Sequence, residues 1–218
     1  MVTSRVLFAV LTAALMLFVF AASVAVPLLC RPFYYAHIDA LELTEKRVWT
    51  KEEMIAAYDE MLDYCLYGGE FGTGVLKWSD SGKDHFDDCA FLFRLDFMAL
   101  FGSVAVLLCG FLLRKKGMRP ARPCGLGVPF WGGASLLTLS AVTAALTAID
   151  FDRAFVVFHK IFFPGKENWF FDYKTDQIIL ILPEAFFRNC AILVGSLMTV
   201  ACVALIVADV CHKRKHLA

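Results

Sequence analysis

Two histidines of the 218-residue chain have neighbours that could support acid–base chemistry. Asp88 follows His85 by three residues, and on a helix this spacing places both side chains on one stripe. A carboxylate one turn from an imidazole can fix its tautomer and raise its basicity, as a general base requires. His159 lies in an aromatic-rich stretch, residues 155–187. The two histidines are therefore the candidate groups for proton transfer.

Each of these histidines also has a plain structural explanation. A His–Asp pair at this spacing is more often part of a solvated helix face, and an imidazole among phenylalanines is usually an interfacial residue with satisfied hydrogen bonds. His37, after the first apolar run, is best explained in that way. However, His85 and His159 are both expected at the rim of a membrane span and on the same side of the membrane. This coincidence favours a shared site.

The composition is that of a membrane protein. Hydrophobic residues make up 59% of the chain and 21 residues are phenylalanine, whereas soluble domains are roughly 45–50% apolar. Four apolar runs approach the roughly 20 helical residues that cross a hydrocarbon core. We therefore predict an all-α membrane protein, a single membrane domain over residues 1–218, whose two extracytoplasmic loops carry amphipathic or interfacial helices. The expected transmembrane helices cover about residues 6–29, 91–113, 125–149 and 188–210.

The charges of the connecting segments predict the orientation. Residues 114–124 contain five Lys or Arg and no acid, and the tail, residues 211–218, contains three more basic residues. Short basic segments stay on the cytoplasmic side, so we expect both termini to be cytoplasmic. The loops at about residues 30–90 and 150–187 then face outward. In agreement, residues 30–96 contain fourteen acidic and seven basic side chains.

Local signals predict the beginnings of three helices. Thr50 and Glu53 form a capping box before a helix of about 16 residues. Asp152 is the expected N-cap of the helix that carries His159. Pro183 and Glu184 suit the first turn of the fourth spanning helix, because proline tolerates that position and an acid there complements the helix dipole.

The spacing of the cysteines and the absence of familiar catalytic motifs argue against several classes of site. The eight cysteines include no C-x-x-C pair, so neither a zinc site nor a disulfide framework is predicted. A bridge between Cys65 and Cys89 is left open, although buried thiols fit the apolar surroundings better. The sequence contains no obvious cofactor motif or G-x-S-x-G nucleophile elbow. No metal, cofactor or nucleic acid is expected.

Two motif blocks make the sequence similar to a known family, the lipoprotein intramolecular transacylases of Gram-positive bacteria. The family's first block, H-M-x-D-V, stands here as His85-Phe86-Asp87-Asp88-Cys89, which departs from it at Phe86 and Cys89. The second block reads F-x-x-F-H-x-x-F-F-P, followed by W and then by L-P-E-x-F-F. It is matched at Phe155, Phe158, His159, Phe162, Phe163, Pro164, Trp169, Leu182, Pro183, Glu184, Phe186 and Phe187. The resemblance covers nearly the whole chain.

This resemblance implies an acyl transfer within one substrate molecule. The sn-2 acyl chain of a diacylglyceryl-modified N-terminal cysteine moves to the α-amino group of that cysteine, giving a lyso-form lipoprotein. The implied partners are diacylated bacterial lipoproteins and membrane lipid of the cell envelope, and the implied catalytic residues are His85 and His159. We expect His85 to be the base, oriented by Asp88, and His159 to stabilise the oxyanion and donate a proton, although the roles could be exchanged. Trp169 and Glu184 are expected to support the site, Trp169 as part of the wall for acyl chains.

The chemistry of the residues is compatible with this reaction. An α-ammonium group with a pKa of about 8 must lose a proton before it attacks an ester, and a histidine can accept that proton. A second imidazole can stabilise the oxyanion. Because amine and ester belong to one molecule, orientation removes much of the entropic barrier and no covalent enzyme intermediate is needed. The active site would face the outer leaflet.

Two other functions are compatible with the same residues. His85, Asp88 and His159 could bind a metal ion in a membrane hydrolase, although this spacing is a weak ligand signal. The chain could instead be a non-catalytic scaffold or a lipid-binding partner protein. A transporter is disfavoured, because no ionisable residue falls in the middle of an expected transmembrane helix.

Overall fold

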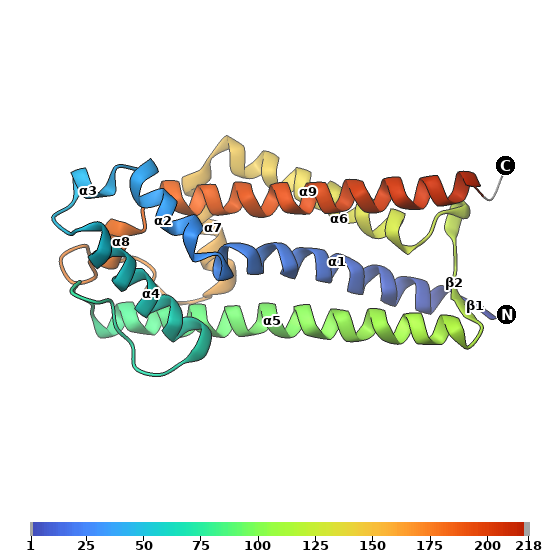
Figure 1. Cartoon of the computed structure of the whole chain (residues 1–218), viewed down its shortest axis with the longest axis horizontal. Helices are drawn as coiled ribbons and strands as arrows, with labels where there is room; N and C mark the ends of the chain where they lie inside the picture. The colour runs from blue at the N-terminus through green and yellow to red at the C-terminus, as the bar shows by residue number, and fades with distance from the viewer. Residues whose placement is uncertain (1, 216–218) are drawn as a thin grey trace. The chain divides into compact units, whose positions relative to one another are not determined.

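The computed structural model describes residues 2–215, so residues 216–218 of the expected cytoplasmic tail lie outside the described chain. The regular elements of this part of the chain are helices, apart from one short pair of strands (Figure 1). Its elements are β1 (Val2–Ser4), α1 (Arg5–Leu29), α2 (Arg31–Ala40), α3 (Leu43–Lys46), α4 (Lys51–Tyr67), α5 (Asp80–Lys115), β2 (Met118–Pro120), the 3₁₀ helix η1 (Pro123–Gly125), α6 (Val128–Ile149), α7 (Phe151–Phe162), α8 (Ile178–Ile181) and α9 (Glu184–Lys215).

Four helices in residues 2–215 are long and apolar enough to cross a membrane, namely α1, α5, α6 and α9. In each of these helices, at most 28% of the most apolar stretch of 18 residues is buried within the chain, so lipid must cover the rest. This confirms the predicted all-α membrane protein with four spanning helices. Helix α5 has 36 residues, well above the roughly 20 that a span needs. Its first turns, which carry His85, can therefore extend beyond the hydrocarbon core.

The chain divides into two compact units, and α1, α5 and α9 each contribute residues to both. The single membrane domain expected from the sequence stays a prediction. The first unit comprises Met1–Ala25, Asp96–Ala148 and Leu193–Ala218, and the second comprises Val26–Leu95 and Ile149–Ile192.

The first unit packs its apolar helices around Val19, Leu136, Met198 and Cys202. Gly133 allows a close helix approach, because a Cβ at this position would lie 2.8 Å from the carbonyl oxygen of Cys202. The sequence did not predict that β1 and β2 pair in parallel in this unit.

The second unit contains the larger core. Its most deeply buried side chains come from α2, α4 and α8 and include Tyr34, Ile38, Met54, Ile178 and Ile181. Helices α2 and α8 both contact α4. Phe86 and Ala90 of α5, the helix that carries His85, also belong to this core.

The predicted helix starts in this unit are confirmed at α4 and α9 and wrong at α7. The hydroxyl of Thr50 accepts the N–H of Glu53 and the carboxylate of Glu53 accepts the N–H of Thr50, so the capping box is present. Helix α9 begins at Glu184, as predicted. The N-cap of α7 is Asp150 rather than Asp152. Asp150 has extended backbone angles and accepts the N–H of Arg153 at 2.9 Å, whereas Asp152 already lies in the first turn.

Candidate active site

His85 lies near the beginning of α5. The hydroxyl of Ser79 accepts the N–H of Gly82 at 3.1 Å, which caps the first turn of this helix. The imidazole of His85 is only 6% exposed. Its ring contacts two phenylalanines in T-shaped geometry, with centroid distances of 5.0 Å to Phe163 and 5.3 Å to Phe171. Apolar contacts therefore hold the ring.

His159 lies in the last part of α7 and is 7% exposed. Its Nδ1 is 2.7 Å from the backbone carbonyl oxygen of Phe155. A carbonyl oxygen can only accept a hydrogen bond, so Nδ1 carries the proton and the neutral ring has its lone pair on Nε2. Burial lowers the pKa of His159 below its usual value, against the opposing effect of the hydrogen bond to Phe155. His159 is therefore neutral at pH 7.

The structure brings the two histidines together. Their ring centroids are 5.9 Å apart and their planes are inclined by 29°. The Nε2 atom of His85 is 3.5 Å from the sulfur of Cys89, and its buried Nδ1 atom has no hydrogen-bond partner within the described chain. An unsatisfied buried polar group costs about 1–3 kcal/mol, which a ligand could offset. The pair thus presents one nitrogen with a lone pair, on His159, and one unpartnered nitrogen, on His85.

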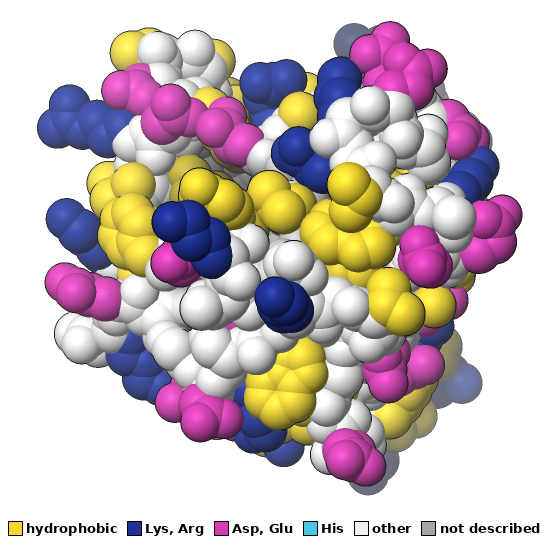
Figure 2. Space-filling model, turned by 90° about the vertical axis from the view of Figure 1, so that its left-hand side faces the viewer, with side chains coloured by type: hydrophobic (Ala, Val, Ile, Leu, Met, Phe, Trp, Pro, Cys, Tyr) yellow, Lys and Arg dark blue, Asp and Glu magenta, His cyan; other side chains and the backbone are white. Residues whose placement is uncertain are grey.

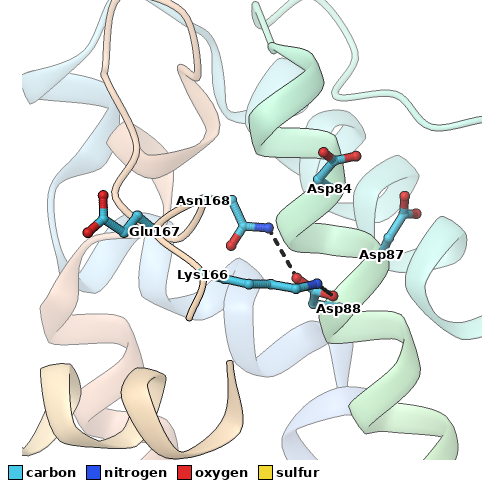
Figure 3. Close-up of a pocket in the computed structure, with 6 residues that line it drawn as sticks. All are labelled: Asp84, Asp87, Asp88, Lys166, Glu167 and Asn168. Atoms are coloured by element: carbon cyan, nitrogen blue, oxygen red, sulfur yellow. Dashed lines mark hydrogen bonds and ion pairs between the residues drawn. The ribbon is translucent and has the colours of Figure 1, made fainter. Parts of the chain in front are cut away.

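Asp88 makes different contacts from those expected. Its carboxylate forms an ion pair with Lys166 and accepts a hydrogen bond from the side-chain amide of Asn168 at 3.1 Å (Figure 3). Within residues 2–215, no hydrogen bond joins Asp88 to the ring of His85. Asp88 therefore attaches the segment after α7 to α5, and its expected role in orienting His85 stays a prediction.

Trp169 and Glu184, the other two residues expected to support the site, lie in different surroundings. The indole of Trp169 is 8% exposed, stacks on His159 with a centroid distance of 4.6 Å, and donates its N–H to the carbonyl oxygen of Lys166. Glu184 interacts with the carboxyl group of Asp152. In the described part of the chain, neither a hydrogen bond nor an ion pair joins Glu184 to either histidine.

A shallow pocket of about 490 Å³ lies against α5, and His85 is not among the residues that line it. Figure 3 shows the three aspartates of α5 on one side of it and the segment after α7 on the other. The side-chain oxygen of Asn168 is buried there without a partner in residues 2–215. Four carboxylates against one ammonium make the pocket negative, so it should attract cationic groups. It is lined by Asp84, Asp87, Asp88, Lys166, Glu167 and Asn168.

The surface at the end of the molecule with α3 and α8 is chemically mixed. Acidic, basic and hydrophobic side chains alternate over it without a single dominant patch (Figure 2). The two histidines, in contrast, are buried. The histidine pair is thus distinguished from this surface by its burial.

The other site chemistry considered from the sequence finds less support in the geometry. Within residues 2–215, no three His, Cys, Asp or Glu side chains are arranged to hold a metal ion. Cys65 and Cys89 are free thiols, so the bridge that the sequence left open is not formed. Sequence reasoning did not find Lys166, Asn168 or Phe171 as site residues, because their partners are on α5, far away in the sequence.

Comparison with known proteins identifies the family. A model of the family described as lipoprotein intramolecular transacylase Lit matches residues 9–187. The structure of the membrane-integral lipoprotein intramolecular transacylase Lit from Bacillus cereus is similar, with a TM-score of 0.86 and 24% identity over 98% of each chain.

Two further structures of the Bacillus cereus protein, with an H85R and an H85A mutation, each have a TM-score of 0.78 and 25% identity. These alignments cover 97% of this chain and 94% and 95% of those chains. The search of curated proteins found no match. Because the family model covers most of its length, the chain belongs to the lipoprotein intramolecular transacylase Lit family.

Proposed function

We propose that the protein is a transacylase that moves the sn-2 acyl chain of a diacylglyceryl-cysteine lipoprotein to the α-amino group of the same cysteine. The observation that carries this proposal is the pair of buried imidazoles, His85 and His159, with centroids 5.9 Å apart. Membership of the Lit family supports the reaction class, and the motif blocks around both histidines support these two residues as its catalytic groups.

The hydrogen bond of His159 supports this residue as the base, the reverse of the roles first expected. Because Nδ1 donates to the carbonyl oxygen of Phe155, Nε2 can accept a proton. After the α-ammonium group has released one proton to solvent, neutral His159 takes a second proton from the amine as its nitrogen attacks the ester carbonyl carbon. The N–C bond forms while the carbonyl electron pair moves onto oxygen.

His85 is then the group that stabilises the oxyanion. If the thiol of Cys89 donates to Nε2, the proton of the neutral ring is on the unpartnered Nδ1, which can donate to the oxyanion. When the tetrahedral intermediate collapses, the C–O bond to the glyceryl group breaks. The leaving alkoxide takes the proton from His159, so both histidines return to their starting states and no water or cofactor is consumed.

The charges support an active site at the outer leaflet with both termini in the cytoplasm. Residues 114–124 are basic without an acid, whereas residues 30–96 are strongly acidic. The negative pocket between α5 and the segment after α7 would attract the α-ammonium group of a diacylated lipoprotein. Trp169 and the phenylalanines around the histidines would form the wall along which acyl chains lie.

Mass spectrometry of one abundant lipoprotein tests this function directly. The lipoprotein is isolated from a bacterium that makes only diacyl lipoproteins, with and without this gene. An unchanged total mass, with one acyl chain moved from the glyceryl group to the N-terminus, is the expected result. Loss of a fatty acid would instead indicate a hydrolase, and no change with a correctly inserted protein would indicate a scaffold.

Three histidine variants refine this test. His85→Ala and His159→Ala should each abolish the transfer while the protein stays inserted. His37→Ala is the matched control, because its Nδ1 also contacts the carbonyl oxygen four residues earlier, at Phe33, but its Nε2 contacts the amide of Asn189. His37→Ala should keep the activity.

A further inference from the structure

We infer that Asp176 is a positioning residue of the histidine pair, which acts through Ser79 on the first turn of α5 and so holds His85 at its place beside His159. The activity arm of this inference rests on the proposed function. Asp176 lies just before α8, and the sequence did not predict a role for it.

Asp176 is a buried carboxylate whose partners are well defined. It is 4% exposed. Its oxygens accept hydrogen bonds from the backbone N–H of Ser79 at 2.8 Å, from the hydroxyl of Ser79 at 2.9 and 2.8 Å, and from the hydroxyl of Thr175 at 2.7 Å. Hydrogen bonds to an ionised acceptor are strong, and a negative charge is favoured at a helix N-terminus. Asp176 therefore holds the residue that caps α5.

Gly82 shows how closely the first turn of α5 packs on this carboxylate. A Cβ at Gly82 would lie 2.0 Å from Oδ1 of Asp176 and 3.2 Å from the ring of Phe171. The neighbouring residues add two hydrogen bonds, because Gln177 donates its N–H to the carbonyl oxygen of Lys77 and its side-chain oxygen accepts the N–H of Lys77. The contact is thus steric as well as polar.

His85 lies one helical turn after Gly82, so the position of its ring depends on this contact. The segment that connects α7 to α8, residues 163–177, reaches α5 at two places. Asp176 holds Ser79, and Lys166 with Asn168 holds Asp88. His85 lies between these two attachments.

The same segment also supplies three of the aromatic rings that contact the histidines. Phe163 and Phe171 flank His85, and Trp169 stacks on His159. A shift of residues 163–177 relative to α5 would therefore move the surroundings of both imidazoles at once. Because a misplacement of about 1 Å can reduce a rate about 100-fold, loss of the Asp176 contact should lower kcat. KM should change less than kcat, because Asp176 itself does not line the pocket, although the same segment carries Lys166, Glu167 and Asn168, which do.

The first test compares Asp176→Asn and Ser79→Ala with Asp172→Asn. Asp172 is an exposed acid of the same segment whose side chain accepts, among residues 2–215, only the N–H of Lys174, which makes it the matched control. We expect kcat per folded enzyme to fall tenfold or more in the first two variants, with a smaller change in KM, and kcat to stay unchanged in Asp172→Asn. Folded, inserted Asp176→Asn and Ser79→Ala proteins with kcat within twofold of the parent would overturn the inference.

A second readout does not depend on activity. In protein with ¹³C-labelled histidine, the ring signal of His85, assigned by its loss in His85→Ala, should shift in Asp176→Asn and Ser79→Ala and stay in place in Asp172→Asn. An unchanged His85 signal in both Asp176→Asn and Ser79→Ala would reject the positioning role. If the parent protein moves no acyl chain while the signal shifts as expected, the proposed function fails and the positioning inference stands.

The contact between Gly82 and Asp176 allows a test by coupled mutations. Gly82→Ala alone should lower kcat and the unfolding temperature, because the new methyl group displaces the carboxylate. In an Asp176→Ala background the same change should have a much smaller additional effect. An equal effect of Gly82→Ala in both backgrounds would show that this contact does not set the position of α5.

Discussion

The indole of Trp169 stacks on the imidazole of His159, with ring centroids 4.6 Å apart and planes inclined by 28°. Trp169 is itself held by a hydrogen bond of 3.0 Å from its ring N–H to the carbonyl oxygen of Lys166. This arrangement covers one face of the proposed base and keeps water from it. Trp169 thus contributes to the apolar burial that lowers the pKa of His159.

Trp169→Ala should lower the transacylation rate about tenfold or more, because the mutation exposes His159 and removes the ring that stacks on its imidazole. Trp169→Phe keeps an aromatic face and should lose less activity. Rates from mass spectrometry of the lipoprotein, normalised to folded protein, provide the measurement. Equal activity of the alanine and phenylalanine variants would show that stacking is not needed. Tyr173→Ala, an exposed aromatic of the same segment, serves as the control.

The lowered pKa of His159 predicts how stability depends on pH. The unfolded chain protonates this histidine near pH 6.5, whereas burial keeps the folded state neutral to lower pH. Between the two pKa values the unfolded state binds more protons, so the stability contribution is complete above pH 6.5 and decreases as the pH falls toward the folded pKa.

We expect His159→Gln to lose less of its unfolding temperature between pH 7 and pH 5 than the parent protein does. Thermal unfolding in detergent at a series of pH values measures this difference. Parallel pH curves for the parent and His159→Gln would contradict the predicted shift.

Mutations of the ion pair between Asp88 and Lys166 distinguish two roles for Asp88. If Asp88 acts by attaching residues 163–177 to α5, Asp88→Asn and Lys166→Met should lower activity by similar factors, on the order of fivefold, and the double variant should lose little more. If Asp88 acts directly on His85, Lys166→Met should be nearly silent. Rates for the two single variants and the double variant separate these outcomes.

A buried carboxylate in the first unit gives a prediction about stability alone. Asp209 is 5% exposed and accepts hydrogen bonds from the N–H of Gly127 at 2.7 Å and from the guanidinium of Arg122 at 3.1 Å. Asp209→Ala should destabilise the protein by about 1–3 kcal/mol, because it leaves a buried N–H without its acceptor.

Lys213→Ala is the control for this prediction. Lys213 is on the same helix and donates to the carbonyl oxygen of Cys124, but this hydrogen bond is exposed, so its loss should change stability by no more than about 0.5 kcal/mol. Denaturant unfolding in mild detergent compares the two variants. A smaller loss for Asp209→Ala than for Lys213→Ala would show that Gly127 finds another acceptor.

Features that depend only on residues close together in the chain could be predicted from the sequence. Apolar runs of sufficient length predict spanning helices because each helix satisfies its own backbone hydrogen bonds in lipid. The capping box of Thr50 and Glu53 was correctly predicted because its two residues are only three positions apart in the chain. The motif blocks around His85 and His159 were enough to indicate the family.

Tertiary structure decided which side chains meet around these histidines. Asp88 follows His85 by one turn, yet its partners Lys166 and Asn168 are 78 and 80 residues away, and Asp176 is 97 residues from Ser79. Contacts between such distant residues leave no periodic pattern in the chain, because they depend on how the segment after α7 folds back onto α5. The start of α7 also depended on structure, since Asp150 and Asp152 have the same capping chemistry and only the backbone at Asp150 is extended.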